Sequence, residues 1–190
     1  MDDIPADGLA QVAFAGRSNV GKSTLLNALA RTKLARTSAA PGKTRLANIY
    51  RVALDGGAGG PGRWSVYFVD LPGYGYARGG DDSAAELAAV AAAYFKSGSG
   101  RQRATLHLID SRHPALRSDV DAARWFDSIG VERVVVATKI DKLSRAERDK
   151  NLKEIGRVTG RAPLPVSAAS GEGLDELWRL IARVAREQHP

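Results

Sequence analysis

The stretch that most constrains the fold of this chain is the octet Gly16–Ser23, with the sequence GRSNVGKS. It fits the phosphate-loop pattern G-x-x-x-x-G-K-[ST] at every fixed position. The apolar residues 12–15 before it predict a strand, and residues 24–29 after it predict a helix. A glycine-rich turn that binds nothing is the alternative. The strand–loop–helix setting favours a phosphate site, because inward-pointing backbone N–H groups and a helix N-terminus both attract anions.

Two side chains of the octet suit a nucleotide, and a second motif supports them. The Lys22 ammonium can reach β and γ phosphates, and the Ser23 hydroxyl can hold Mg²⁺. The D-x-x-G pattern Asp70–Gly73 follows an apolar strand at residues 66–69. An acidic residue at such a strand end is placed to hold Mg²⁺ through a water. The N–H of the closing glycine can contact a γ phosphate, because glycine has no Cβ to prevent close approach.

Composition limits the class of protein. The 190 residues suggest one domain, and 44% hydrophobic residues are enough to bury a core. The absence of cysteine excludes disulfides and thiol catalysis. No apolar run approaches the ~20 residues of a membrane span, and the first residues show no signal-peptide pattern. We therefore expect a cytoplasmic protein with a short tail at residues 1–8 and one domain over residues 9–190.

Positive charge is concentrated near the N-terminus. The net charge is +7, and the stretch from Gly8 to Leu54 contains eight Lys or Arg residues but no Asp or Glu. Some of these side chains can balance a bound triphosphate, and others can form a solvated surface. A triphosphate alone does not need eight cations, so the pattern favours a second polyanion such as RNA.

Strand and helix patterns alternate along the chain. Strands are predicted at residues 11–15, 46–54, 64–69, 104–109, 131–137 and 164–166. Helices are predicted at residues 22–31, 83–96, 118–129 and 144–158, and at the C-terminus, where Leu174, Leu177, Trp178, Ile181 and Val184 share a core-facing side. This order predicts a six-stranded, mostly parallel α/β sheet covered on both faces. The glycine-rich turn at residues 55–62 makes one edge pair antiparallel. His107, inside a strand, is expected to be structural.

A third motif, Thr138–Asp141, indicates which base is bound. The Asp141 carboxylate can accept hydrogen bonds from guanine N1–H and N2–H₂ together, whereas adenine presents an N1 lone pair to it. The Lys139 stem can lie over the base. Residues Val166–Ala168 end the last predicted strand, where a backbone N–H can meet guanine O6.

The polar loop at residues 32–45 offers a nucleotide-dependent switch. It contains Pro41-Gly42-Lys43 followed by Thr44. A hydroxyl there can complete a Mg²⁺ shell and order the loop only while the γ phosphate is present. The alternative is that Thr44 is one of several ordinary threonines of the loop.

These residues together resemble the EngB type of bacterial GTPase, within the TrmE-Era-EngA-EngB-Septin-like GTPase superfamily. The resemblance spans about residues 9 to 187. It rests on VAFAGRSNVGKS (12–23), LARTS (34–38) with PGKT (41–44), DLPGYGYA (70–77), DSRHP (110–114) with Asp119, and TKID (138–141). The tyrosine-rich segment 70–77 and the Arg-His-Pro element are the parts specific to that family.

The resemblance implies a three-layer P-loop NTPase of the Ras-like G-domain type that binds GTP or GDP. It implies Mg²⁺ held by Ser23, by Thr44 and, through water, by Asp70. It implies catalytic roles for Lys22, Thr44, Asp70 and Gly73. The implied nucleotide contacts are Gly16, Arg17, Ser18, Asn19, Val20, Gly21, Lys22, Ser23, Gly42, Lys43, Thr44, Arg45, Leu46, Asp70, Leu71, Pro72, Gly73, Thr138, Lys139, Ile140, Asp141, Val166, Ser167 and Ala168.

The resemblance also implies a role in assembly of the large (50S) ribosomal subunit, linked to cell division and septation. The implied partner is a 50S precursor or its rRNA. We expect no membrane or DNA partner and a monomer off the ribosome. The alternative is an rRNA-binding scaffold with little or no GTP turnover, against which the intact Lys22, Asp70 and Asp141 argue.

One position departs from a familiar hydrolysis mechanism. Ras-type enzymes orient the attacking water with a glutamine after the D-x-x-G glycine, and here that residue is Tyr74. We expect slow intrinsic turnover, stimulated by K⁺ or by the ribosome. Asparagine at the position of Asn19 ligates K⁺ in some related GTPases, although it can also simply stabilise the turn. Tyr74, Tyr76 and Arg78 either stack on RNA bases or pack the loop.

Overall fold

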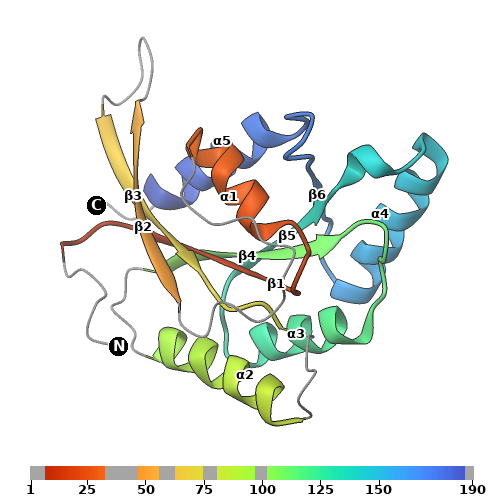
Figure 1. Ribbon diagram of the computed structural model, residues 1–190, viewed down its shortest axis with the longest axis horizontal. Helices are drawn as coiled ribbons and strands as arrows, with labels where there is room; N and C mark the ends of the chain where they lie inside the picture. The colour runs from red at the N-terminus through yellow and green to blue at the C-terminus, as the bar shows by residue number, and fades with distance from the viewer. Residues whose placement is uncertain (1–6, 33–46, 56–62, 75–80, 97–101, 187–190) are drawn as a thin grey trace.

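A six-stranded sheet forms the centre of the computed structural model, which describes residues 7–32, 47–55, 63–74, 81–96 and 102–186 (Figure 1). The strands are β1 (Gln11–Gly16), β2 (Asn48–Asp55), β3 (Arg63–Asp70), β4 (Gln102–Asp110), β5 (Arg133–Thr138) and β6 (Leu164–Pro165). The helices are α1 (Lys22–Ala30), α2 (Asp81–Lys96), α3 (Arg117–Ser128), the 3-10 turn η1 (Ile140–Lys142), α4 (Arg145–Thr159) and α5 (Leu174–Arg186).

The strand order confirms the predicted fold class. The order is β2-β3-β1-β4-β5-β6, and every neighbouring pair is parallel except β2 and β3. The antiparallel pair lies at the edge, as expected for two strands joined by a short turn. In the parallel part, the carboxyl ends of β1, β3, β4 and β5 meet at one edge of the sheet, where ligands of open α/β sheets bind.

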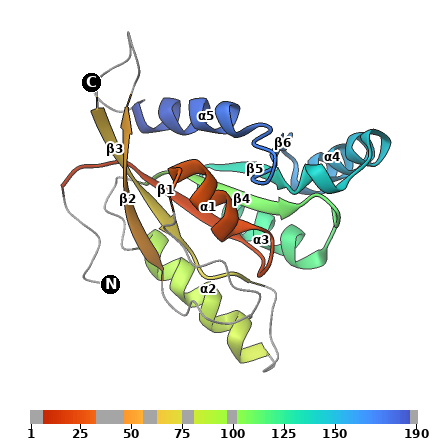
Figure 2. The same cartoon turned by 45° about the horizontal axis from the view of Figure 1, so that its top comes forward.

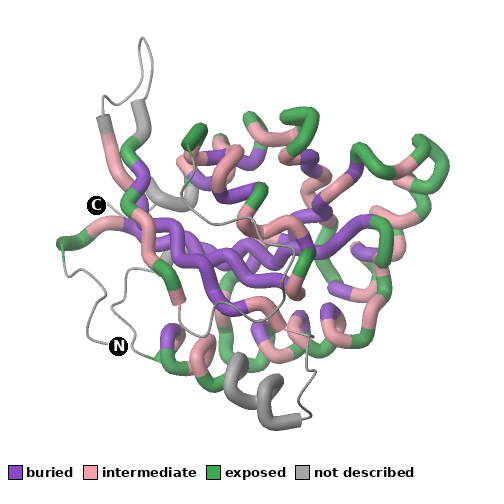
Figure 3. The backbone as a smooth tube through the Cα atoms, viewed as in Figure 1, coloured by how far each residue is buried: buried purple, intermediate pink, exposed green. Residues whose placement is uncertain are grey.

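Helices cover both faces of the sheet, which gives three layers (Figures 1 and 2). On one face α1 and α5 pack against the strands, and the core there includes Phe14, Phe68, Leu25 and Ile181. On the other face α2, α3 and α4 contribute to two smaller clusters, one of them centred on Phe126. The strands of the sheet centre are the most buried part of the chain (Figure 3). They are near-continuous apolar runs because both of their faces are covered.

The C-terminal helix packs as its sequence period predicts. Leu177 and Ile181 are fully buried, and Leu174 packs against the same cluster. The Trp178 ring lies 5.6 Å from the Phe68 ring, centroid to centroid, so Trp178 is a packing residue. The Val184 side chain lies outside the described residues.

Element boundaries differ from the predicted ones by one or two residues. α2 begins at Asp81 rather than 83, and β5 begins at Arg133 rather than 131. The second difference has a clear cause, because the Val131 N–H donates to the Phe126 carbonyl and closes the turn after α3. α4 begins where Ser144 and Glu147 form a capping box, in which each side chain accepts from the other residue's backbone N–H.

Two predicted loops lie outside the described residues, apart from the residues at their ends. They are the polar loop at 32–45 and the glycine-rich turn at 55–62. Within the described part of the chain, no helix is both long and apolar enough to span a membrane.

Candidate nucleotide-binding site

The phosphate loop lies between β1 and α1, in the predicted strand–loop–helix setting. Asn19 and Gly21 adopt left-handed backbone conformations, with φ of 64° and 103°, so the chain reverses sharply before α1. Val20 is buried and fixes the loop to the core. The first turn of α1 contains no acidic residue, so the partial positive charge of its N-terminus is not offset there. The loop can therefore attract an anion.

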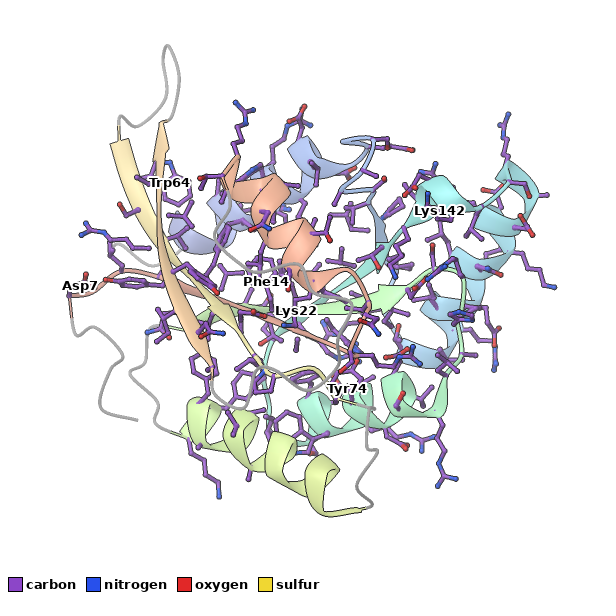
Figure 4. All side chains as sticks on the ribbon, in the orientation of Figure 1. Asp7, Phe14, Lys22, Trp64, Tyr74 and Lys142 are labelled. Carbon is purple, nitrogen blue, oxygen red and sulfur yellow. The ribbon has the colours of Figure 1, made fainter. Side chains whose placement is uncertain are left out.

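Lys22 and Asp70 meet beside this loop. The Lys22 ammonium donates a hydrogen bond to a carboxylate oxygen of Asp70, and the two side chains are only 10% and 4% exposed. Parallel pairing of β1 with β3 sets Phe14 opposite Asp70 and brings the two groups together. Lys22 lies at the start of α1, near the centre of the view in Figure 4.

The oxygen atoms beside Lys22 suit a hard cation. Ser23 is the second residue of α1, partly buried, and its hydroxyl is one such oxygen. The Asp70 carboxylate at the end of β3 is another. Hydroxyl and carboxylate oxygens are the ligands that Mg²⁺ prefers. The residues present therefore fit a magnesium-bound phosphate.

The segment after β3 follows β1 onto the phosphate loop. The Leu71 N–H donates to the Phe14 carbonyl at 3.0 Å, and the Tyr74 N–H donates to the Gly16 carbonyl at 3.3 Å. In return, the Ser18 N–H donates to the Tyr74 carbonyl at 3.1 Å. A Cβ on the intervening Gly73 would lie 3.0 Å from the Ser18 nitrogen. A side chain here would crowd the loop itself, so glycine is favoured by this contact, which the sequence argument did not anticipate.

The predicted guanine motif is joined to the phosphate loop by hydrogen bonds. The Thr138 hydroxyl, at the end of β5, donates to the Val20 carbonyl at 2.7 Å. The Lys139 ammonium crosses the loop and donates to the Asn19 carbonyl at 2.6 Å and to Asp110 at 2.9 Å. The bonds to the Val20 and Asn19 carbonyls join residues more than 110 positions apart, so the two motifs form one site.

Asp110 is the residue of this site whose role the sequence analysis did not assign. Burial alone would raise the pKa of its carboxyl, but hydrogen bonds from Arg112 and Lys139 lower that pKa to about 2. It therefore stays ionised and orients the Lys139 ammonium. In the sequence Asp110 is an acidic residue at the end of a predicted strand and the first residue of the DSRHP element, and neither signal indicates that it contacts Lys139.

The Asp141 carboxylate is held in place by the loop after β6. It accepts a hydrogen bond from the Ser167 hydroxyl at 2.7 Å, and this bond lowers the pKa of Asp141. The backbone N–H groups of Val166 and Ser167 donate to Ala137 and Glu172. Among the described residues no acceptor contacts the Ala168 N–H, so this is the group left to meet a ligand carbonyl.

Tyr74 does not extend toward the phosphate side of the loop. Its phenol oxygen lies 2.7 Å from His107 Nε2 and donates to Asp119 Oδ1 at 2.9 Å. Figure 4 shows Tyr74 close to α3. The packing interpretation of this tyrosine is therefore favoured over stacking on RNA. Tyr76 and Arg78 lie outside the described residues.

Burial shifts the titration of this cluster. It raises the pKa of Asp119 to about 6 and that of Tyr74 well above its ordinary value. It lowers the pKa of His107 to about 3, with a further contribution from the Arg133 charge. Arg17 of the phosphate loop also approaches Asp119, with its Nε 4.0 Å from Oδ2.

Five predicted nucleotide contacts cannot be placed. They lie outside the described residues and are Gly42, Lys43, Thr44, Arg45 and Leu46. The other predicted contacts all lie at the carboxyl edge of the sheet or in the loops that leave it. Their part in nucleotide binding stays a prediction.

Comparison with known proteins gives the family. A family model described as 50S ribosome-binding GTPase matches residues 11–139. A probable GTP-binding protein EngB from Solibacter usitatus is 42% identical over 181 residues, which cover 95% of this chain and 88% of that protein. The corresponding protein from Thermotoga maritima is 39% identical over 189 residues, covering 97% and 91%.

Solved structures agree with the fold. A crystal structure of a probable GTP-binding protein engB is similar with a TM-score of 0.71 at 21% identity, covering 94% of this chain and all of that one. The crystal structure of an Era variant from Aquifex aeolicus bound to GDP.AlF4- is similar with a TM-score of 0.74 at 27% identity. The match covers 95% of this chain and 58% of that chain. Era in complex with MgGDPNP and a fragment of 16S ribosomal RNA gives the same values.

The fold and the phosphate loop define the class: this protein is a P-loop GTPase. Within that class, the chain belongs to the EngB family of GTP-binding proteins.

The buried cluster predicts an unusual dependence of stability on pH. The pKa of Asp119 is raised on folding, so the folded state binds this proton more tightly and stability falls as pH rises from about 4 to 6. The shift corresponds to on the order of 3 kcal/mol. The pKa of His107 is lowered, so stability is lost as pH falls below about 6.5. The two effects oppose each other in the wild-type protein.

Single substitutions should separate the effects of Asp119 and His107 on the pH dependence of stability. We expect the free energy of unfolding of Asp119→Asn to fall more steeply than that of the wild type between about pH 6 and pH 4. His107→Gln should become more stable relative to the wild type over the same range. Urea denaturation at several pH values measures both. Curves that run parallel to the wild-type curve would contradict the assigned pKa shifts.

Proposed function

We propose that this protein is a Mg²⁺-dependent switch that binds and hydrolyses GTP and acts in assembly of the large (50S) ribosomal subunit. The observation that carries the proposal is the joining of two motifs at one sheet edge. Lys22 and Asp70 lie beside the phosphate loop, and Lys139 links that loop to the segment carrying Asp141. The proposed phosphate site and the proposed base site are therefore connected by a direct hydrogen bond.

Guanine selectivity is assigned to Asp141. A carboxylate with a lowered pKa is ionised at neutral pH and offers only acceptors. Guanine presents N1–H and N2–H₂ to such a group, whereas adenine presents a lone pair that would be repelled. The Ala168 N–H is the donor proposed for guanine O6.

The phosphates are assigned to the backbone of residues 16–23 and to Lys22. Ser23 and Thr44 hold Mg²⁺ in the proposal, and Asp70 holds it through water. The ion supplies positive charge to the phosphoryl oxygens. Lys22 leaves Asp70 to bind the phosphates, because each group then meets a partner of opposite charge. Gly73 lies next to the loop, where its N–H can face the γ phosphate.

Hydrolysis is proposed to be slow without an activator. The Tyr74 hydroxyl is hydrogen-bonded to two buried groups and so cannot orient a water. Other GTPases are activated by the added positive charge of an arginine finger, and here a different group is proposed to supply that charge. We assign this role to K⁺ bound by Asn19, or to the ribosome.

An rRNA partner is supported by charge and by relatives. The chain carries a net charge of +7, and the acid-free stretch from Gly8 to Leu54 is strongly basic. The matching family is described by its binding to the 50S ribosome, and Era has been crystallised with a 16S rRNA fragment. The proposal includes cytoplasmic location, a role linked to cell division and septation, a monomer off the ribosome and one GTPase domain over residues 9–190.

Nucleotide identity can be tested with two variants. Lys22→Ala should weaken GTP and GDP binding by at least about tenfold, because a charge-assisted phosphate contact is lost. Asp141→Asn should bind xanthosine nucleotides in preference to guanosine nucleotides. The asparagine amide donates where xanthine carries a carbonyl in place of the guanine amine. Fluorescence titration with labelled nucleotides measures both, and an unchanged base preference in Asp141→Asn would rule out its assigned role.

The assignment of K⁺ is tested by turnover at equal ionic strength in KCl and in NaCl. We expect faster GTP hydrolysis in KCl, and we expect Asn19→Ala to remove the difference while GDP binding is retained. Equal wild-type rates in the two salts would eliminate K⁺ as the activator.

The ribosomal role is tested by sedimentation with 50S subunits. The protein should pellet with subunits in a non-hydrolysable GTP analogue and be released in GDP, at two salt concentrations. If the protein pellets with subunits equally in both nucleotides and shows no measurable hydrolysis, the alternative of an rRNA-binding scaffold would be favoured.

A further inference from the structure

The feature that nucleotide binding does not explain is a buried polar cluster under the phosphate loop. We call Tyr74, His107, Asp119 and Arg17 the Tyr74 cluster. Its members come from four places in the chain: the segment after β3, β4, α3 and the phosphate loop. The Tyr74 phenol oxygen lies 2.7 Å from His107 Nε2 and 2.9 Å from Asp119 Oδ1.

The direction of each hydrogen bond follows from the groups present. An ionised Asp119 can only accept, so the Tyr74 hydroxyl donates to it. The phenol oxygen then accepts from His107, which assigns the neutral tautomer with hydrogen on Nε2. His107 Nδ1 has no hydrogen-bond partner among the described residues. The single hydroxyl proton of Tyr74 is therefore already used.

Burial makes these two bonds costly to break. His107 is 0% exposed and Asp119 is 2% exposed. If Tyr74 rotated away, a buried carboxylate and a buried ring N–H would lose their hydrogen-bond partner. Each such loss shifts an equilibrium by on the order of tenfold. The phenol therefore stays in the cluster rather than turning toward a nucleotide.

The same residue holds the backbone beside the phosphate loop. The Tyr74 N–H and carbonyl pair with Gly16 and Ser18, forming a parallel bridge after the end of β1. Its neighbours in the sequence, Gly73 and Gly75, have no side chain that could anchor this segment. The Tyr74 side chain therefore adds a side-chain attachment to the backbone hydrogen bonds that hold the segment next to Gly73.

Asp119 also reaches the loop from the other side. Its second carboxylate oxygen lies 4.0 Å from the Arg17 Nε. One buried carboxylate on α3 therefore holds both the phosphate loop and the D-x-x-G segment.

We propose that Tyr74 is a positioning residue, whose hydroxyl, held by Asp119 and His107, fixes the Gly73 backbone beside the phosphate loop. This inference rests on the proposed binding and hydrolysis of GTP at this site. It explains why tyrosine stands where other GTPases have a water-orienting glutamine. The side chain acts through the position of its neighbour and does not touch the reacting atoms.

The test compares Tyr74→Phe with the wild type. This change keeps the ring and removes the hydroxyl. Because only GTP carries a γ phosphate, we expect the kcat for GTP to fall about tenfold and the Kd of a non-hydrolysable GTP analogue to rise several-fold. The Kd for GDP should stay within about twofold of the wild-type value.

Tyr94→Phe is the matched control. Tyr94 is also buried, and its hydroxyl donates to Gln11 at 3.0 Å, but it lies on α2 away from the phosphate loop. We expect Tyr94→Phe to lower the thermal unfolding temperature without changing kcat or the analogue Kd. This control separates the general effect of deleting a buried hydroxyl on stability from the specific effect of Tyr74 on the position of Gly73.

A double-mutant cycle identifies the partner. Asp119→Ala should reproduce the losses of kcat and of analogue affinity seen in Tyr74→Phe. The double variant should lose no more than the more impaired of the two single variants. Asp119→Asn keeps an acceptor for the hydroxyl and should retain most of the activity. If Tyr74→Phe does not fold, the contrast between Asp119→Ala and Asp119→Asn gives the same information.

Three results would overturn the inference: an unchanged kcat and analogue Kd in Tyr74→Phe, equal losses for GDP and the analogue, or additive effects in the cycle. Failure of the proposed function looks different, because the wild type itself would then fail to bind guanine nucleotides or to hydrolyse GTP. If the wild type binds without turnover, the ratio of analogue Kd to GDP Kd still decides the inference.

Discussion

Parallel pairing of β1 with β3 on one side and β4 on the other is the constraint on which the site depends. Parallel strands end at the same edge, so every loop that leaves that edge can contribute to one ligand. β1 delivers the phosphate loop there, β3 delivers Asp70, and β5 delivers Thr138. The pairing is stabilised because these strands carry many buried apolar residues and are covered by helices on both faces.

Polar side chains then fix the relative positions of the loops that the strands bring to one edge of the sheet. Thr138 and Lys139 donate to carbonyl groups of the phosphate loop, and Asp110 holds the Lys139 ammonium. On the other side of the loop, Asp119 is approached by Arg17 and bonded to Tyr74. Apart from the exposed Asn19, each of these residues is at least partly buried, where an unpaired polar group is costly. The loop is thus supported from both flanks before any nucleotide is considered.

Local patterns were enough to predict the fold class and the places of the motifs. The strand–loop–helix around Gly16–Ser23 and the apolar face of α5 with Leu177 are features of single segments, and both were confirmed. The network around Tyr74 could not be predicted this way. Its partners His107 and Asp119 lie 33 and 45 residues away, and in the sequence a tyrosine between glycines reads equally well as an RNA contact. Asp110 was missed for the same reason.

The sequence by itself determined the alternation of strands and helices, the phosphate loop and the family, because these depend on residue types at short, fixed spacings. Only the tertiary structure decided what those residues do to one another. Lys22 is paired with Asp70, Lys139 bonds the phosphate loop, and the phenol of Tyr74 turns inward. The physical reason is that burial leaves each polar group only the partners that neighbouring strands and helices supply, and sheet order, unlike local pattern, is a long-range property.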